Sequence, residues 1–453
     1  MKIFRFFIVS YTLSSFLFSQ SSVLRSGPMV GYGQMTEVLL WVQTTKTATV
    51  QYLYWDAAEP KTKLKSTTAK TTEENAFVAK TLITGLLPGK KFEYVLLIDG
   101  NVVKRNYPLR FQTQPLWQWR TDPPEFSVAF GSCTYINEPP WDRPNDTYGG
   151  NYEIFSVIAQ KNPDLMLWLG DNTYLREIDW DTKSGIIHRY THTRQTPEMQ
   201  PLLGAAHNYA IWDDHDYGPN NSDRSYHLKN DALETFKLFW GNQTYGTDET
   251  KGIFSRFMWG DVEFFLLDDR YHRSPNDAPN DERKTMFGKS QLQWLKDALI
   301  NSSASFKFVV NGNQILNPNG LYYEALPQFP HEYSDLISYI KKNKISGVIF
   351  LSGDRHHTEL ILHNDTTFYP LYEFTSSPLT SGLNTMKQKE GSPTKEFSNP
   401  LRVPGTLVND KRNFGILRFS GPRQDRKVLM ETYDITGAVR WSKEIRVNDL
   451  TVQ

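Results

Sequence analysis

Side chains that can bind a hard metal ion or a phosphate follow five separate apolar, strand-like runs of this chain. The runs 126–130, 164–169, 209–212, 262–267 and 347–351 lead into Cys133, into Asp171 and Tyr174, into the acidic run 213–216, into Asp268 to Arg270, and into Asp354 to His357. A single apolar strand that stops at a polar residue is ordinary, because the chain is leaving the core. Five such ends, with Cys, Tyr and His among them, favour a metal site.

The most concentrated of these groups is Asp213-Asp214-His215-Asp216. Three carboxylates and an imidazole within four residues would be costly near a buried sheet without a cation to neutralise them. The run therefore indicates a metal or catalytic role, and a solvated loop is the alternative.

Two further groups have a spacing that suits a metal centre. Asp171 and Tyr174 lie three residues apart after a buried strand, and a phenolate ligand suits a hard, trivalent ion. Asp354 and His356 alternate with Arg355, whose guanidinium could clamp a phosphate oxygen in a bidentate way. The pattern predicts ligands on both sides of a phosphate-binding arginine.

Other polar residues at the strand ends are expected behind the ligands or against the substrate. They are Asn172, Asp213, Asp269, Arg270 and His357. Asp269 and Arg270 suit a supporting pair better than ligation. Neither Ser132 nor Ser352 lies in a Gly-x-Ser-x-Gly elbow, so a serine nucleophile is not expected.

The elements that must position these groups alternate between strands and helices from residue 125 onward. Helical patterns cover 152–160, 232–240, 289–300 and 333–342, and the stretch 414–447 is typical of two or three closing strands. Alternation of this kind predicts an α/β fold with a parallel or mixed sheet covered by helices. The carboxyl ends of neighbouring parallel strands meet in one crevice, so groups roughly 220 positions apart can lie together there.

The region before residue 115 has a different pattern, with short alternating strands at 37–43, 47–55, 76–83 and 92–98. This is typical of a β-sandwich, and we place one at 22–114, followed by a linker at 114–124 and a second domain at 125–447. No His, Asp or Glu gathers at the strand ends of the first region. Its expected role is support, docking or partner recognition.

Composition bounds the partners and the location. Fifty basic and fifty acidic residues leave no net charge, which argues against nucleic acid or an anionic membrane surface as an electrostatically selected partner. Residues 1–20 have the pattern of an export signal, with a membrane anchor as the alternative, and no later segment is long and apolar enough to cross a bilayer. We expect a periplasmic or extracellular protein.

Cys133 is the only cysteine, so the chain cannot form an intramolecular disulfide and no disulfide-linked partner chain is expected. Metal ligation as a thiolate and burial as a small hydrophobe are both open interpretations of a lone thiol in an exported protein.

The motifs together resemble those of the PhoD-type alkaline phosphatases, which belong to the calcineurin-like metallophosphoesterase superfamily. The resemblance rests on Gly131-Ser132-Cys133, on Gly170-Asp171 with Tyr174, on Trp212 to Asp216 followed by Asn220-Asn221, and on Ser352-Gly353-Asp354-Arg355-His356. It implies a metallophosphoesterase-like mixed β-sheet core flanked by helices, preceded by a fibronectin- or Ig-like sandwich.

The resemblance also implies a centre of two metals, Fe³⁺ and Ca²⁺. Cys133, Asp171 and Tyr174 would bind the iron with one residue of the last motif, Asp171 would bridge both ions, and Asp214 would bind the second. Asp354 and His356 would complete the two coordination spheres. His215 would donate a proton and Arg355 would face the substrate. The chain departs from the family pattern at Asp216, where Glu is expected, and at Asn172, where an aromatic residue is frequent.

Two cations a few ångströms apart can provide hydroxide near neutral pH and hold phosphoryl oxygens for in-line attack. The sequence therefore predicts an exported phosphohydrolase for small phosphomonoesters, phosphodiesters or both. A phospholipase D-like phosphodiesterase is one alternative. The other is a non-catalytic extracellular binding protein whose metals only stabilise the fold.

Overall fold

The computed structural model describes residues 23–142, 148–321, 324–384 and 399–452, so the predicted export signal lies outside the described residues. Two large β-sheets lie face to face and carry one continuous core. Aromatic pairs join the sheets, among them Phe130 with Phe374 and Phe308 with Phe419. The predicted class, a mixed-sheet core with helices preceded by a β-sandwich, is confirmed.

The nine-stranded sheet has the order β21-β20-β19-β10-β11-β12-β1-β2-β6. Its central strands β10 (Phe126–Gly131), β11 (Leu165–Leu169) and β12 (His207–Ile211) are parallel and fully buried. The C-terminal strands β19 (Asn413–Ser420), β20 (Lys427–Asp434) and β21 (Val439–Arg446) add antiparallel beside β10, so the predicted two or three closing strands are three.

The six-stranded sheet has the order β13-β14-β15-β16-β18-β17. The strands are β13 (Ser255–Trp259), β14 (Val262–Leu266), β15 (Phe306–Val310), β16 (Val348–Ser352), β17 (Glu359–Asp365) and β18 (Phe368–Thr375). The middle four, β14, β15, β16 and β18, are parallel, whereas β13 and β17 are antiparallel edges. Both sheets therefore bring parallel strand ends to the same side of the molecule.

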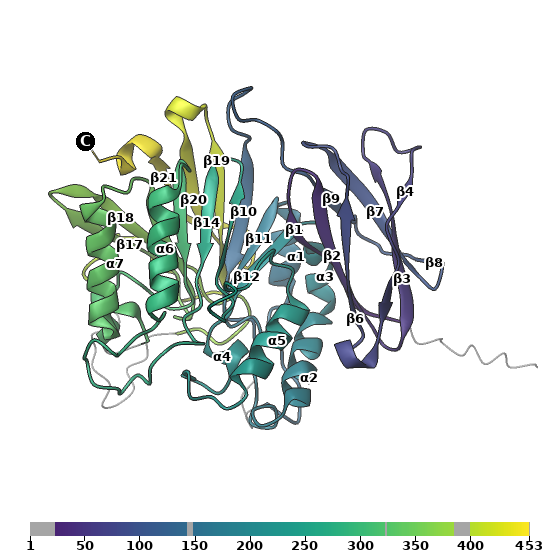
Figure 1. Cartoon of the computed structure of the whole chain (residues 1–453), viewed down its shortest axis with the longest axis horizontal. Coiled ribbons are helices and arrows are strands. Elements are labelled where there is room, and N and C mark those ends of the chain that lie inside the picture. The colour runs from purple at the N-terminus through teal and green to yellow at the C-terminus, as the bar shows by residue number, and fades with distance from the viewer. Residues whose placement is uncertain (1–22, 143–147, 322–323, 385–398, 453) are drawn as a thin grey trace, which may run out of the picture.

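Helices cover the sheets as the alternation predicts (Figure 1). The four predicted helices are present as α1 (Glu153–Gln160), α5 (Lys229–Phe239), α6 (Lys289–Asn301) and α7 (Pro330–Lys342). The sequence pattern did not indicate α2 (Lys183–Arg194) or the short α3 (Gln200–Leu203). The buried face of α2 is largely polar, with Arg189, Thr191, Thr193 and Arg194, so it shows no apolar periodicity.

The N-terminal sandwich is not an independent layer. Its strands β1 (Leu24–Gly33), β2 (Glu37–Thr44) and β6 (Val78–Thr84) continue the nine-stranded sheet, because β1 pairs with β12 in parallel. The facing sheet holds β3 (Ala48–Asp56), β4 (Leu64–Lys65), β5 (Ala69–Thr71), β7 (Lys91–Ile98), β8 (Asn101–Val103) and β9 (Arg110–Gln112). The sandwich thus extends the core that positions the strand ends.

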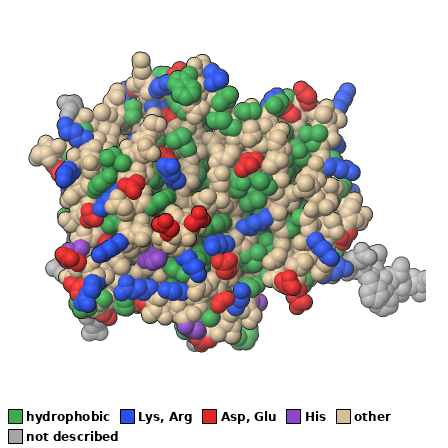
Figure 2. All heavy atoms as spheres, viewed as in Figure 1, with side chains coloured by type: hydrophobic (Ala, Val, Ile, Leu, Met, Phe, Trp, Pro, Cys, Tyr) green, Lys and Arg blue, Asp and Glu red, His purple; other side chains and the backbone are tan. Residues whose placement is uncertain are grey.

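Among the described residues, the helices are all too short or too polar to span a bilayer. Figure 2 shows Lys and Arg side chains interspersed with Asp and Glu over the visible face, as expected for a chain without net charge.

One buried histidine joins the sandwich to the core. The Nδ1 of His207 donates to the carbonyl of Gly31 at 2.9 Å, and its Nε2 accepts from the backbone N–H of Gln112 at 3.2 Å. Both hydrogen bonds are made by a neutral ring, and burial lowers the pKa of His207 to about 4.

We expect this histidine to make the fold sensitive to mild acid. The unfolded chain takes up a proton at this ring below about pH 6.5 whereas the folded chain does not, so stability is lost as the pH falls from 6.5 toward 4. The free energy of unfolding should fall by about 2 kcal/mol more between pH 7 and pH 5 in the wild type than in His207→Gln. Urea titrations at both pH values measure this, and equal pH dependence in the two proteins would contradict it.

Candidate metal centre

The strand ends converge on a cleft of about 470 Å³. Its described lining comprises Tyr135, Tyr148, Asp171, Tyr174, Asp214, His215, Asn220, Asn221, Glu324, Asp354, Arg355, His356, Gly382, Leu383 and Asn384. A larger groove of about 610 Å³ lies beside α6, but none of the candidate ligands lines it. The cleft is therefore the place where the predicted chemistry can occur.

A first group of potential ligands comprises Cys133, Asp171 and His356, whose ligand atoms all lie within 4.8 Å of one another. The hydroxyl of Tyr174 joins them, since it lies 2.9 Å from Asp171 Oδ2 and 3.3 Å from His356 Nε2. On the other side of the imidazole, His356 Nδ1 lies 2.6 Å from the carbonyl of Gly382. That contact places the proton on Nδ1 and leaves the Nε2 lone pair for a metal.

A second group comprises Asp171, Asp214 and His215, again within 4.8 Å, so Asp171 belongs to both. The backbone N–H of Asn221 donates to Asp214 Oδ2 at 2.7 Å and fixes that carboxylate. The ring of His215 stacks on Tyr174 with centroids 4.2 Å apart. A carboxylate shared by two adjacent ligand groups is the arrangement expected of a bridging ligand.

The backbone at these positions is strained. Cys133, Asp171, Asp354 and His356 have φ values of 62°, 51°, 66° and 56°, in the left-handed region that non-glycine residues rarely adopt. Each such residue costs roughly 1 kcal/mol or more and persists where the surroundings require its side chain in one place. The strain therefore coincides with the predicted ligands.

The electrostatics fit a cation. Burial, followed by the negative charge of Asp214, raises the pKa of Asp171 far above its usual range. Burial likewise raises the pKa of the Cys133 thiol. For Asp214 burial acts in the same direction, but His215 and Arg270 outweigh it and lower the pKa of Asp214. Ionising all these groups together requires positive charge between them, which metal ions would supply.

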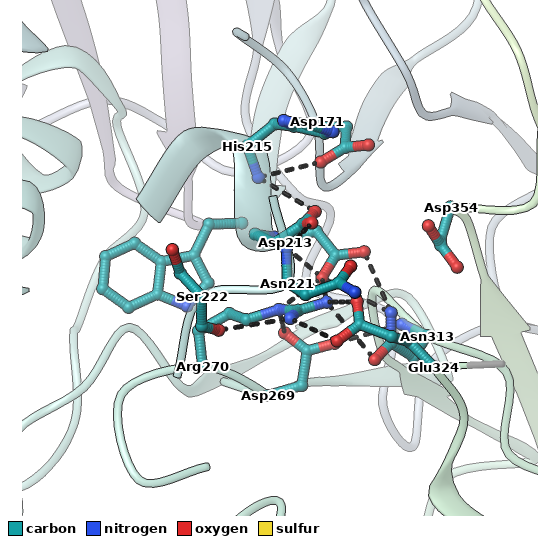
Figure 3. Close-up of polar contacts among 12 residues, drawn as sticks. Asp171, Asp213, His215, Asn221, Ser222, Asp269, Arg270, Asn313, Glu324 and Asp354 are labelled. Atoms are coloured by element: carbon teal, nitrogen blue, oxygen red, sulfur yellow. Dashed lines mark hydrogen bonds and ion pairs between the residues drawn. The ribbon is translucent and has the colours of Figure 1, made fainter. Parts of the chain in front are cut away.

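Asp354 and Arg355 lie on the wall of the same cleft. Arg355 Nη1 is 3.3 Å from Asp354 Oδ2, and Figure 3 shows the Asp354 carboxylate apart from the dashed contacts around Asp213 and Arg270. Asp354 lies outside both groups of ligand atoms described above. Its role as a ligand stays a prediction, as does the contact of Arg355 with substrate.

The three aspartates of the acidic run 213–216 are buried and His215 is half-buried, which excludes the solvated-loop alternative. Asp213 caps α4 (Asp214–Tyr217) by accepting from the N–H of Asp214 at 2.9 Å. Asp216 accepts from the N–H groups of Asp213 and Asn172, and burial raises the pKa of Asp216 to about 8. Asp216, which stands where a glutamate was expected, thus links the two ligand-bearing loops by hydrogen bonds.

The remaining predicted residues lie behind the ligands. Asp269 Oδ2 accepts from the N–H of Asn313 at 3.0 Å, and burial raises the pKa of Asp269 to about 6. Arg270 is completely buried and pairs with Asp213 and Glu324. His357 contacts Glu359 at 3.5 Å and is absent from the described lining of the cleft.

Several residues of the site have no counterpart among the predicted ones. Asn313 follows β15, a sixth strand end that carries amides instead of charges, and Glu324 lies in a loop without any pattern. Tyr148 contacts His356 Nδ1 at 3.2 Å. The amide pair Asn220-Asn221 is a sequence signal for this part of the site, because both residues line the cleft and the N–H of Asn221 binds Asp214.

Comparisons with known proteins agree with this geometry. A family model described as PhoD-like phosphatase matches residues 128–425, and a model of a domain of unknown function matches residues 21–116. Alkaline phosphatase D of Bacillus subtilis (strain 168) is 23% identical over an alignment of 350 residues, and the match covers 63% of this chain and 58% of that protein. The match therefore spans less than two thirds of the relative's length.

Two solved structures share the fold. A structure of PhoD superposes with a TM-score of 0.76 and 18% identity, covering 94% of this chain and 92% of that one. The purple acid phosphatase PPD1 from yellow lupin (Lupinus luteus) seeds superposes with a TM-score of 0.67 and 11% identity, covering 93% and 75% of the two chains. Both likenesses extend over the sandwich as well as the core.

Proposed function

The chain belongs to the PhoD-like phosphatase family, and from this we propose that it is an exported, metal-dependent phosphohydrolase that cleaves small phosphomonoesters, phosphodiesters or both. The observation that carries the proposal is the pair of ligand groups that share Asp171 at one end of an open cleft. The B. subtilis relative supports a phosphatase, and residues 1–20 support export.

The residues present fit two ions. Cys133, Asp171, Tyr174 and His356 offer the thiolate, carboxylate, phenolate and imidazole that suit Fe³⁺. Asp171, Asp214 and Asp354 offer the oxygen ligands that suit Ca²⁺, with His215 beside them. Such ions would activate water and neutralise charge on the phosphoryl group.

The chain itself supplies orientation and the remaining charge. Arg355 is the arginine in the described lining of the cleft, where it can bind phosphoryl oxygens as their charge grows. His215 lies beside the bridging carboxylate and can give a ring proton to the departing alkoxide. Tyr135 and Tyr148 form an aromatic wall, 4.8 Å between centroids, that limits the space for the ester group.

The decisive experiment is the metal content of the purified protein by plasma emission spectroscopy, with hydrolysis of a chromogenic phosphomonoester and diester before and after chelation. We expect iron and a divalent ion, loss of activity on chelation, and recovery when both are returned. The faster ester identifies the substrate class. Folded protein without metal that remains inactive on both esters after addition of iron and calcium would contradict the proposal and favour a binding protein.

A further inference from the structure

Arg270 lies at the centre of a buried polar network behind the cleft (Figure 3). Its Nε donates to Asp213 Oδ1 at 2.6 Å, and its two terminal nitrogens donate to the two oxygens of Glu324 at 3.2 and 2.9 Å. Two carboxylates from different loops therefore bind the guanidinium group and fix its orientation.

The same arginine contacts both ends of the segment 213–222, which carries Asp214. At the start of the segment, Asp213 caps α4 through the N–H of Asp214. At its end, Arg270 Nη1 donates to the carbonyl of Ser222 at 3.3 Å, next to Asn221. Because the Asn221 N–H is the group that fixes Asp214 Oδ2, moving either end would move this carboxylate.

Glu324 sets the position of the arginine. Besides its bidentate contact with Arg270, it accepts from Arg273 at 3.1 Å and from Asn276 at 2.8 Å. Glu324 also lines the cleft, whereas Arg270 and Arg273 are completely buried. Among the described residues, the network contacts Asp214 and its neighbours but not Cys133 or His356, which contact the other side of Asp171.

Building on the proposed function, we propose that Glu324 and Arg270 are positioning residues for the second ligand group alone. They hold the segment 213–222 so that Asp214 keeps the second metal in place and His215 stays beside it. Losing their pairing should then release the metal that Asp171 and Asp214 would hold, and spare the metal that Cys133, Asp171 and His356 would hold.

The test compares Glu324→Gln with a variant of a similar buried ion pair elsewhere in the fold. Asp261 accepts from Arg426 Nε and Nη2 at 3.1 and 2.9 Å, and both side chains are buried at the opposite end of β14 from Arg270. Asp261→Asn therefore removes a similar charge from a similar buried pair, without contact to the cleft. Arg270→Lys is a second variant, because lysine keeps the charge but not the fork.

Metal equivalents per chain are measured after dialysis, and apo protein is then titrated with Ca²⁺, Mn²⁺, Zn²⁺ and Mg²⁺ in turn while thermal unfolding records stability. We expect two equivalents in the wild type and in Asp261→Asn, and one in Glu324→Gln and Arg270→Lys. The divalent concentration that half-restores the second equivalent should rise about 10- to 100-fold in the Glu324 and Arg270 variants.

The outcomes separate this inference from the proposed function. Two equivalents with unchanged affinity in Glu324→Gln, or parallel loss of both metals with a lower unfolding temperature, would overturn the inference alone. A wild type that holds no second equivalent would overturn it together with the proposed function.

Discussion

Replacing Asp171 by asparagine is expected to lower kcat/KM for every ester the protein cleaves by at least about 10³-fold, a loss of about 4 kcal/mol of transition-state stabilisation. Asp171 belongs to both groups of potential ligands, so an amide at this position should weaken the binding of both proposed metals at once. Asparagine has the same shape and tolerates the left-handed backbone at φ 51°, which should keep the fold intact. Steady-state kinetics and metal analysis of the same preparation measure the effect.

The matched control is Asp164→Asn, at the other end of the same strand. Asp164 accepts from the N–H of Ser127 at 2.8 Å and from Gln112 Nε2 at 2.8 Å, and it is far from the described lining of the cleft. We expect this variant to lose some stability but to keep its metals and its kcat. If Asp171→Asn stays active and folded with full metal content, Asp171 is not the bridging ligand; if it no longer folds, the metals have a structural role.

The fold could be predicted because its signals are local. Buried strands such as β10 and β11 are continuous apolar runs, and α1, α6 and α7 have an apolar face at helical spacing. The extension of the central sheet into the sandwich could not be predicted. It depends on the pairing of β1 with β12, in which Val30 lies opposite His207, 177 positions away in number, and no local pattern encodes such a partner.

The candidate ligands were predictable for a different reason. Cys133, Asp171, Asp214 and Asp354 directly follow strand ends, and parallel strands bring those ends together. The residues that support the candidate ligands could not be predicted in the same way. Glu324 meets Arg270 across a separation of 54 positions in the sequence, and Asn221 acts through its backbone N–H, which no side-chain type reveals.

Replacing His215 by glutamine is expected to slow hydrolysis by an amount that depends on the leaving group of the ester. Burial lowers the pKa of His215 and the neighbouring Asp214 carboxylate acts in the opposite direction; the ring in its doubly protonated form can give a proton to a departing oxygen and become neutral. An alkoxide needs that proton because it is a strong base, whereas a nitrophenolate leaves without it. Loss of a general acid should therefore slow hydrolysis of an alkyl phosphate by about 10²- to 10⁴-fold and that of a nitrophenyl phosphate by less than about tenfold.

The His356→Gln variant is the control for this test. The Nε2 of His356 faces Tyr174 and the first ligand group, while its Nδ1 is held by the Gly382 carbonyl. Removing this proposed ligand should slow both esters equally, because every substrate would depend on the metal. If His215→Gln also slows both esters equally and releases the second metal, His215 is a ligand and the proton comes from another group. Unequal rates with full metal content would identify the ring of His215 as the acid.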